Sequence, residues 1–233
     1  MSGHRRPLTI ARWAKGSAAV LHDHPMIMLD RDGLPSQLSN VSVVLEGGGL
    51  AQARVRLAAG ARQVLLADAV LHDISLMRSA LSEFGAGRVG AWLPARRAAV
   101  SWALDTQSNG DFKCMAPSNP QARWEVLTGD MRHTGPEVGT WVEQLARMGV
   151  GTILISVDMQ DDRDLDLCAG LVERFGEQLW FSPLSDADTD LASWVEFGQV
   201  RRLVLPDMPA AGVLTERLMA RFGAPRAAQE LAA

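Results

Sequence analysis

The chain has 233 residues, of which 47% are hydrophobic and 21% charged, and its formal net charge is −4. This composition is typical of a globular protein, and the length allows one large α/β domain with a substantial core. No lysine- or arginine-rich block is present, which argues against nucleic acid or an anionic membrane as a partner. After Met1 there is no basic stretch followed by a long apolar run, so we expect a cytoplasmic protein without signal peptide or membrane span.

Short apolar runs alternate with segments of helical periodicity. The runs predict strands at 25–30, 41–46, 62–68, 87–93, 100–105, 151–158, 178–182 and 200–206. The helices between them end at a glycine shortly before the next strand, as in LAAGARQVLLAD and VEFGQVRRLVLP. A helix that ends at a glycine shortly before a strand is typical of βα units packed on a parallel sheet. The N-terminal segment from Pro7 to Lys15 is predicted to be a helix.

Such repeated units fit either a (βα)8 barrel or a doubly wound sheet. A weak internal repeat favours the barrel, because 47–68 resembles 183–207 and 26–33 resembles 153–162. Both pairs are separated by somewhat more than half the chain, as two half-barrels would be. We therefore expect residues 1–233 to form a single TIM-barrel-like α/β domain.

Residues 107–132 interrupt the alternation of predicted strands and helices. Turn residues there surround a polar–apolar alternation that includes Trp124 to Leu127. The segment predicts a long excursion after the strand at 100–105 that contains a small hairpin. Barrel enzymes build their sites from the loops that follow the strands, so this excursion is expected beside a site.

Few residues have the spacing of metal ligands. Cys114 and Cys168 are far apart and are expected to be reduced thiols, and the pair His22 and His24 lacks a third ligand. The acidic run 158–166 would either hold a divalent cation or form a solvated loop and helix start. We therefore expect no metal and no other cofactor.

Gly47, Gly48 and Gly49 follow a predicted strand directly and precede an amphipathic helix. Their backbone N–H groups, together with the helix N-terminus, could cradle a phosphate. The same glycines could serve only as a tight turn. The residues themselves leave both interpretations open.

The stretch from Val43 to Leu205 resembles the HisA/HisF-type phosphoribosyl isomerase and cyclase barrels of histidine biosynthesis. The matching pieces are VVLEGGGLAQARVRLAAGARQVLLADAV, SEFGAGRV, VSWALDTQ, WEVLTGD, TGPEVGTWVEQLARMGVGTILISVDMQDDRDLDL and LVERFG, with extra residues between Gly87 and Gly135. The resemblance implies a half-barrel repeat, a phosphorylated ribose substrate and two phosphate sites at the C-terminal face. It also implies two catalytic aspartates, one ending the first strand and one ending the fifth.

Only one of these aspartates has a clear match. Asp105, which ends VSWALD, matches the fifth-strand aspartate and is the expected acid/base residue; otherwise it caps a loop. If 7–15 is a helix, the first strand is missing or remodelled, and Asp30 ends the second strand. In the alternative register 25–33 is the first strand and Asp30 replaces the missing acid, which requires a deleted βα unit.

The phosphate sites also depart from the family pattern. The SGG that follows the family's seventh strand is Ser182-Pro183-Leu184 here, so an N–H is lost and a side chain added. Asp68 follows the fourth strand and would repel a phosphate. The expected substrate- and phosphate-binding residues are Gly47, Gly48, Gly49, Asp158 and Ser182.

Three functions therefore remain open. In the first, the barrel is recruited to a small phosphorylated or anionic substrate other than the histidine-pathway one, with isomerase- or lyase-type acid/base chemistry. In the second, it is a non-catalytic binding or scaffold protein. In the third, it is a genuine isomerase or cyclase of histidine biosynthesis. A recruited enzyme would keep a polar pocket at the C-terminal ends of its strands. A scaffold would fill it with Leu66, Met159, Leu184 or the long loop. A missing first strand would also favour a homodimer or a protein partner.

Overall fold

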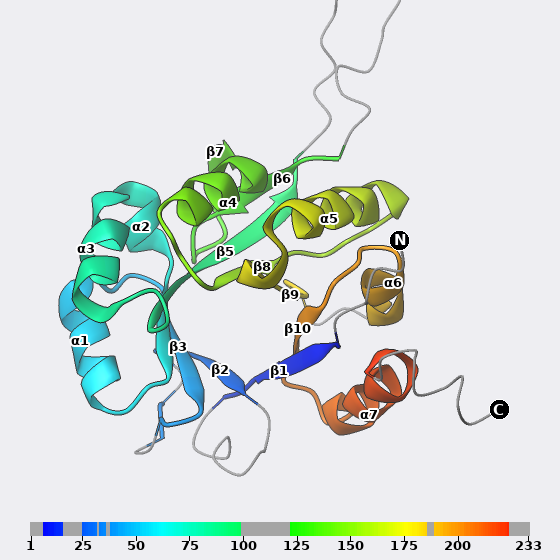
Figure 1. The fold of residues 1–233 in the computed structure, drawn as a ribbon, viewed down its shortest axis with the longest axis horizontal. Helices are drawn as coiled ribbons and strands as arrows, with labels where there is room; N and C mark the ends of the chain where they lie inside the picture. The colour runs from blue at the N-terminus through cyan, green and yellow to red at the C-terminus, as the bar shows by residue number, and fades with distance from the viewer. Residues whose placement is uncertain are drawn as a thin grey trace, which may run out of the picture.

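The computed structural model describes residues 7–15, 25–31, 33–35, 38–98, 122–185 and 189–223. Within them, parallel strands close into a barrel with helices on its outside (Figure 1). The order round the barrel is β1 (Thr9–Trp13), β2 (Met26–Leu29), β3 (Val41–Leu45), β4 (Gln63–Leu66), β5 (Val89–Arg97), β8 (Ile153–Ser156), β9 (Leu179–Ser182) and β10 (Arg202–Leu205). Because β10 pairs with β1 and β4 pairs with β5, the ring is closed, and the predicted (βα)8 barrel is confirmed.

The described helices lie on the outside of this ring (Figure 1). They are α1 (Leu50–Ala58), α2 (Asp68–His72), α3 (Ser75–Phe84), α4 (Val138–Arg147), α5 (Asp162–Phe175), α6 (Leu191–Glu196) and α7 (Ala211–Phe222), with a 3₁₀ turn, η2, at Gly176–Gln178. Side chains alternate along each strand, so Val43 and Leu45 pack outward against helices while Val44 packs inside the barrel. Both faces are buried, which explains why the strands are continuous apolar runs in the sequence.

The N-terminal segment corrects one prediction. The expected helix from Pro7 to Lys15 is wrong, since Thr9–Trp13 is the first barrel strand and pairs in parallel with β10 and β2. Ile10 packs toward the helices and Ala11 toward the lumen, so both faces of the strand are buried. Arg12 points outward and donates from Nη2 to Thr215 Oγ1 of α7 at 3.0 Å. The first strand is therefore present, and the edge that suggested a dimer is closed.

The fifth barrel strand is also reassigned. β5 pairs directly with β4 on one side and with β8 on the other, so the barrel has no place for a further strand at 100–105. The predicted segment VSWALD lies outside the described residues. The end of β5 extends beyond the barrel and pairs antiparallel with β6 (Trp124–Leu127), which pairs with β7 (His133–Glu137). The hairpin expected within 107–132 thus involves residues up to 137.

The internal repeat agrees with the barrel. The repeated segments 26–33 and 153–162 contain β2 and β8, and the segments 47–68 and 183–207 contain β4 and β10. In each pair the two strands lie on opposite sides of the ring. No helix in the described part of the chain is long and apolar enough to cross a membrane. A cytoplasmic location stays a prediction.

Candidate functional site

The C-terminal ends of the barrel strands surround a pocket of about 200 Å³. This is the end of a (βα)8 barrel at which enzymes of this fold place their chemistry. The charged residues that line it are Lys15 after β1, Arg31 after β2, Glu46 after β3 and Asp207 after β10. Arg31 and Glu46 form an ion pair, with Nη1 and Oε2 3.2 Å apart.

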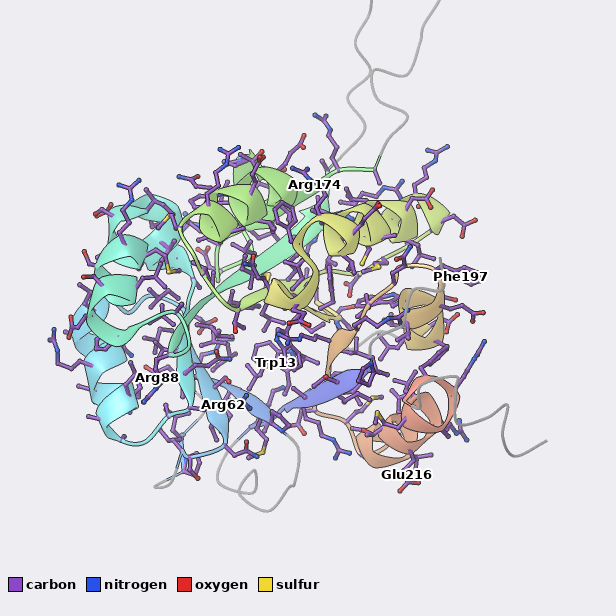
Figure 2. The ribbon with its side chains drawn as sticks, viewed as in Figure 1. Trp13, Arg62, Arg88, Arg174, Phe197 and Glu216 are labelled. Atoms are coloured by element: carbon purple, nitrogen blue, oxygen red, sulfur yellow. The ribbon has the colours of Figure 1, made fainter. Side chains whose placement is uncertain are left out.

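Two tryptophans form the floor of this pocket. Trp13 and Trp92 meet edge to face, with ring centroids 6.1 Å apart and planes at 70°. Figure 2 shows Trp13 inside the ring of strands. Trp92 Nε1 donates to Ser156 Oγ at 2.8 Å, and Ser156 Oγ lies 2.6 Å from Ser182 Oγ. Indole rings therefore fill the upper barrel, and the hydroxyl of Ser182, an expected phosphate ligand, is hydrogen bonded in the buried core.

The two acids implied by the family resemblance have no counterpart at their expected strand ends. The first strand is followed by Ala14 and Lys15, and the fifth, Val89–Arg97, contains no acidic residue. Asp105 lies outside the described residues, so its role stays a prediction. Asp30 does end the second strand, where its carboxylate accepts from Gln52 Nε2 and Arg56 Nε of α1.

Two carboxylates at the mouth accept hydrogen bonds from loop amides. Asp158 Oδ1 accepts from the backbone N–H groups of Leu184 at 2.9 Å and Ser185 at 3.0 Å. Asp68 Oδ1 accepts from Gly129 N at 2.7 Å. Backbone N–H groups of this kind are the donors that a bound anion would need. In these two loops the backbone N–H groups already donate to a carboxylate of the chain itself.

The glycine triplet differs from these two loops. Gly49 is the N-cap of α1, and no side chain caps the helix, so the first-turn N–H groups lack a side-chain acceptor. None of the three glycines has a positive φ. A Cβ at Gly47 or Gly49 would meet nothing within 4 Å, and one at Gly48 would meet only the Gln52 side chain. The backbone conformation requires glycine at none of the three positions, and Gly48 leaves room for the Gln52 side chain, which is hydrogen bonded to Asp30. At Gly47 and Gly49, close approach of a ligand is the remaining reason for glycine.

The acidic run after β8 has mainly structural roles. Asp161 caps α5 by accepting from Arg163 N at 3.1 Å and Asp164 N at 3.3 Å. A hydrogen bond from Arg97 lowers the pKa of Asp161. Asp164 is fully buried and accepts from Trp124 Nε1 at 2.9 Å. Among the described residues, no group of three or more His, Cys, Asp or Glu side chains could hold a metal ion.

The structure therefore brings Glu46, Asp207, Lys15 and Arg31 to one pocket, and none of the four is among the site residues predicted from the sequence. Their common signal is position, since each stands within two residues of the end of a barrel strand. Glu46 was included in a predicted strand, and Lys15 in the wrongly predicted helix. A correct first strand would have indicated both Lys15 and its neighbours as mouth residues.

Comparison with known proteins supports the fold. No protein-family model matches the chain. The chain is 26% identical over 204 residues to the imidazole glycerol phosphate synthase subunit HisF of Synechococcus sp.. This alignment covers 84% of the present chain and 73% of that protein. This similarity and the closed parallel barrel fit a divergent HisA/HisF-type barrel.

Proposed function

We propose that this barrel has been recruited to a small phosphorylated substrate different from the histidine-pathway one, bound at the C-terminal mouth. The observation that carries the proposal is the uncapped N-terminus of α1, preceded by three glycines that the backbone conformation does not require. Glu46 lines the mouth pocket and directly precedes Gly47, so a phosphate at the triplet would place the rest of the molecule toward that pocket. Arg31, paired with Glu46, supplies a cation beside it.

The acid/base groups of such a reaction would be Glu46 and Asp207, the two carboxylates that line the pocket. Isomerase- or lyase-type chemistry needs one group to remove a proton and another to return it. Lys15 lines the same pocket and would stabilise negative charge that develops on a substrate oxygen. These roles replace the strand-end aspartates that the family resemblance implies.

Binding is tested by calorimetric titration with ribose 5-phosphate and, separately, with inorganic phosphate. Gly49→Asp places a carboxylate at the N-cap, where it should occupy the first-turn N–H groups and repel a phosphate. The substitution meets no neighbouring atom and supplies a helix cap, so it should not lower the melting temperature. Gly170→Asp on the exposed side of α5 makes the same charge change elsewhere and should leave binding unchanged. Equal binding by the wild type and Gly49→Asp would contradict the phosphate site.

A second function, a non-catalytic binding barrel, is favoured by the tryptophan-filled lumen and by the Asp158 carboxylate on the 184–185 amides. Proton NMR in D₂O separates it from the first. A proton-transfer enzyme should exchange the C2 proton of bound ribose 5-phosphate for deuterium, and Glu46→Gln should stop the exchange while binding persists. Binding without exchange would favour the non-catalytic barrel. A homodimer or protein partner stays a prediction.

A further inference from the structure

The N-terminal mouth of the barrel contains a second cavity, of about 240 Å³. It shares no lining residue with the pocket at the C-terminal mouth. Its inner end is formed by the apolar lumen residues Ala11, Ile27, Leu65 and Leu154, which are buried. The lumen packing therefore separates the two ends of the barrel, and the N-terminal cavity is a distinct site.

Two arginines line this cavity from opposite sides. Arg62 directly precedes β4 and Arg202 is the first residue of β10, and these strands are on opposite sides of the ring. Arg202 is held in place, because its guanidinium lies 5.6 Å from the Trp180 ring centroid and donates to the backbone carbonyl of Glu177. Trp180 packs against the lumen cluster and forms an aromatic wall of the cavity.

The Arg62 guanidinium has no hydrogen-bond or ion-pair partner among the described residues. Its neighbour on the same face, Arg88, differs in this respect, because Arg88 Nη2 donates to the carbonyls of Ala61 at 3.0 Å and Leu57 at 3.4 Å. Figure 2 labels both arginines, which lie on the same side of the molecule. No described aspartate or glutamate lines the cavity, so neither cation is neutralised by a carboxylate there.

The remaining polar groups add donors. Gln63 Nε2 donates to Ser42 Oγ at 3.0 Å, which holds the amide at the cavity wall, and Thr9 and Thr152 also line the cavity. An arginine fork matches the two oxygens of a carboxylate, and an aromatic wall with an apolar floor matches a flat apolar body. We propose that the N-terminal mouth is a binding site for a small arylcarboxylate-type anion, with its carboxylate on Arg62 and Arg202 and its apolar body against Trp180.

This site is independent of the function proposed for the C-terminal mouth. It is tested on the full chain by calorimetric titration with benzoate, with benzamide as an uncharged ligand of the same shape. Benzoate should bind saturably. Benzamide should bind at least about tenfold more weakly, because its uncharged amide has one oxygen and cannot accept paired hydrogen bonds from two guanidinium groups. Benzoate binding should also weaken as salt is raised, as expected for an ion pair at an open mouth.

Variants locate the site. Arg62→Gln removes a cation whose side chain has no partner in the described structure, so the fold should persist and benzoate affinity should fall at least about tenfold. Arg174→Gln makes the same charge change on the exposed side of α5 and should bind benzoate as the wild type does. Gly49→Asp should likewise leave benzoate binding unchanged, which separates this site from the proposed phosphate site. Absence of saturable benzoate binding, or equal binding by wild type and Arg62→Gln, would overturn the proposal.

Discussion

Asp164 joins the inserted hairpin to the barrel, and its replacement tests that role. The side chain is 0% exposed. Its Oδ1 accepts from Trp124 Nε1 at 2.9 Å, and its Oδ2 accepts from Gln160 N at 2.9 Å and Arg97 Nη1 at 3.4 Å. Trp124 and Arg97 belong to the paired strands β6 and β5, so one carboxylate on α5 fixes both strands beyond the end of the barrel.

In Asp164→Asn, one oxygen can still accept from Trp124, but the new NH₂ group faces the Gln160 N–H. Leaving that buried donor without an acceptor costs about 1–3 kcal/mol, and the loss of charge from the Trp124 hydrogen bond costs about 1 kcal/mol more. Arg97 keeps its ion pair with Asp161 at 2.9 Å and adds little. We therefore expect the free energy of unfolding to fall by about 2–4 kcal/mol.

Urea titration followed by circular dichroism measures this change. Asp162→Asn is the matched control, because Asp162 is an exposed residue in the first turn of the same helix. Its replacement should cost less than about 1 kcal/mol, the usual size of a helix-dipole interaction. If Asp164→Asn lies within about 1 kcal/mol of Asp162→Asn, the carboxylate does not hold the hairpin and the reasoning is refuted.

Two further predictions concern the barrel and its acid stability. A Cβ on Gly90 of β5 would lie 2.5 Å from the Thr152 carbonyl oxygen, so Gly90→Ala should lower the free energy of unfolding by about 1–3 kcal/mol and lower the melting temperature. Gly139→Ala is the control, because a Cβ there meets no atom within 4 Å and the melting temperature should not fall. Equal melting temperatures for the two variants would contradict this prediction. The pKa of Asp161 is lowered in the folded state, chiefly by the Arg97 hydrogen bond, so its stabilising effect is complete above the ordinary carboxyl pKa and is lost as pH falls through the lowered value. Between neutral pH and about pH 3, the free energy of unfolding measured by urea titration should therefore fall less for Asp161→Asn than for the wild type. Equal falls in the two proteins would show that the Asp161 carboxylate does not contribute to this pH dependence.

Much of the barrel could be predicted from the sequence because most of its strands are buried on both faces and stand out as apolar runs. The first strand was missed for a physical reason. In TIARW, Ile10 and Trp13 have helical spacing, and Arg12 suggests a solvent-facing side, yet Arg12 is half-buried against α7 and bonded to Thr215. A polar side chain with a distant partner has no local signature, so only the barrel closure reveals the strand.

The candidate site was less predictable than the fold. The glycine triplet could be found because glycine itself is the signal, whereas Lys15 and Asp207 have meaning only once the strand ends are known. Asp158 was selected as a substrate ligand, but its hydrogen bonds to the 184 and 185 amides depend on the distance between two loops. The assignment of the fifth strand failed because β5 is longer than the barrel requires and continues into a hairpin.

The central claim is that the triplet before α1 still binds a phosphate group, and calorimetric titration of the wild type and Gly49→Asp with ribose 5-phosphate tests it most directly. The proposed site predicts saturable binding by the wild type that Gly49→Asp abolishes and Gly170→Asp preserves, with all three proteins folded by circular dichroism. No binding by the wild type, or equal binding by the wild type and Gly49→Asp, would contradict the claim.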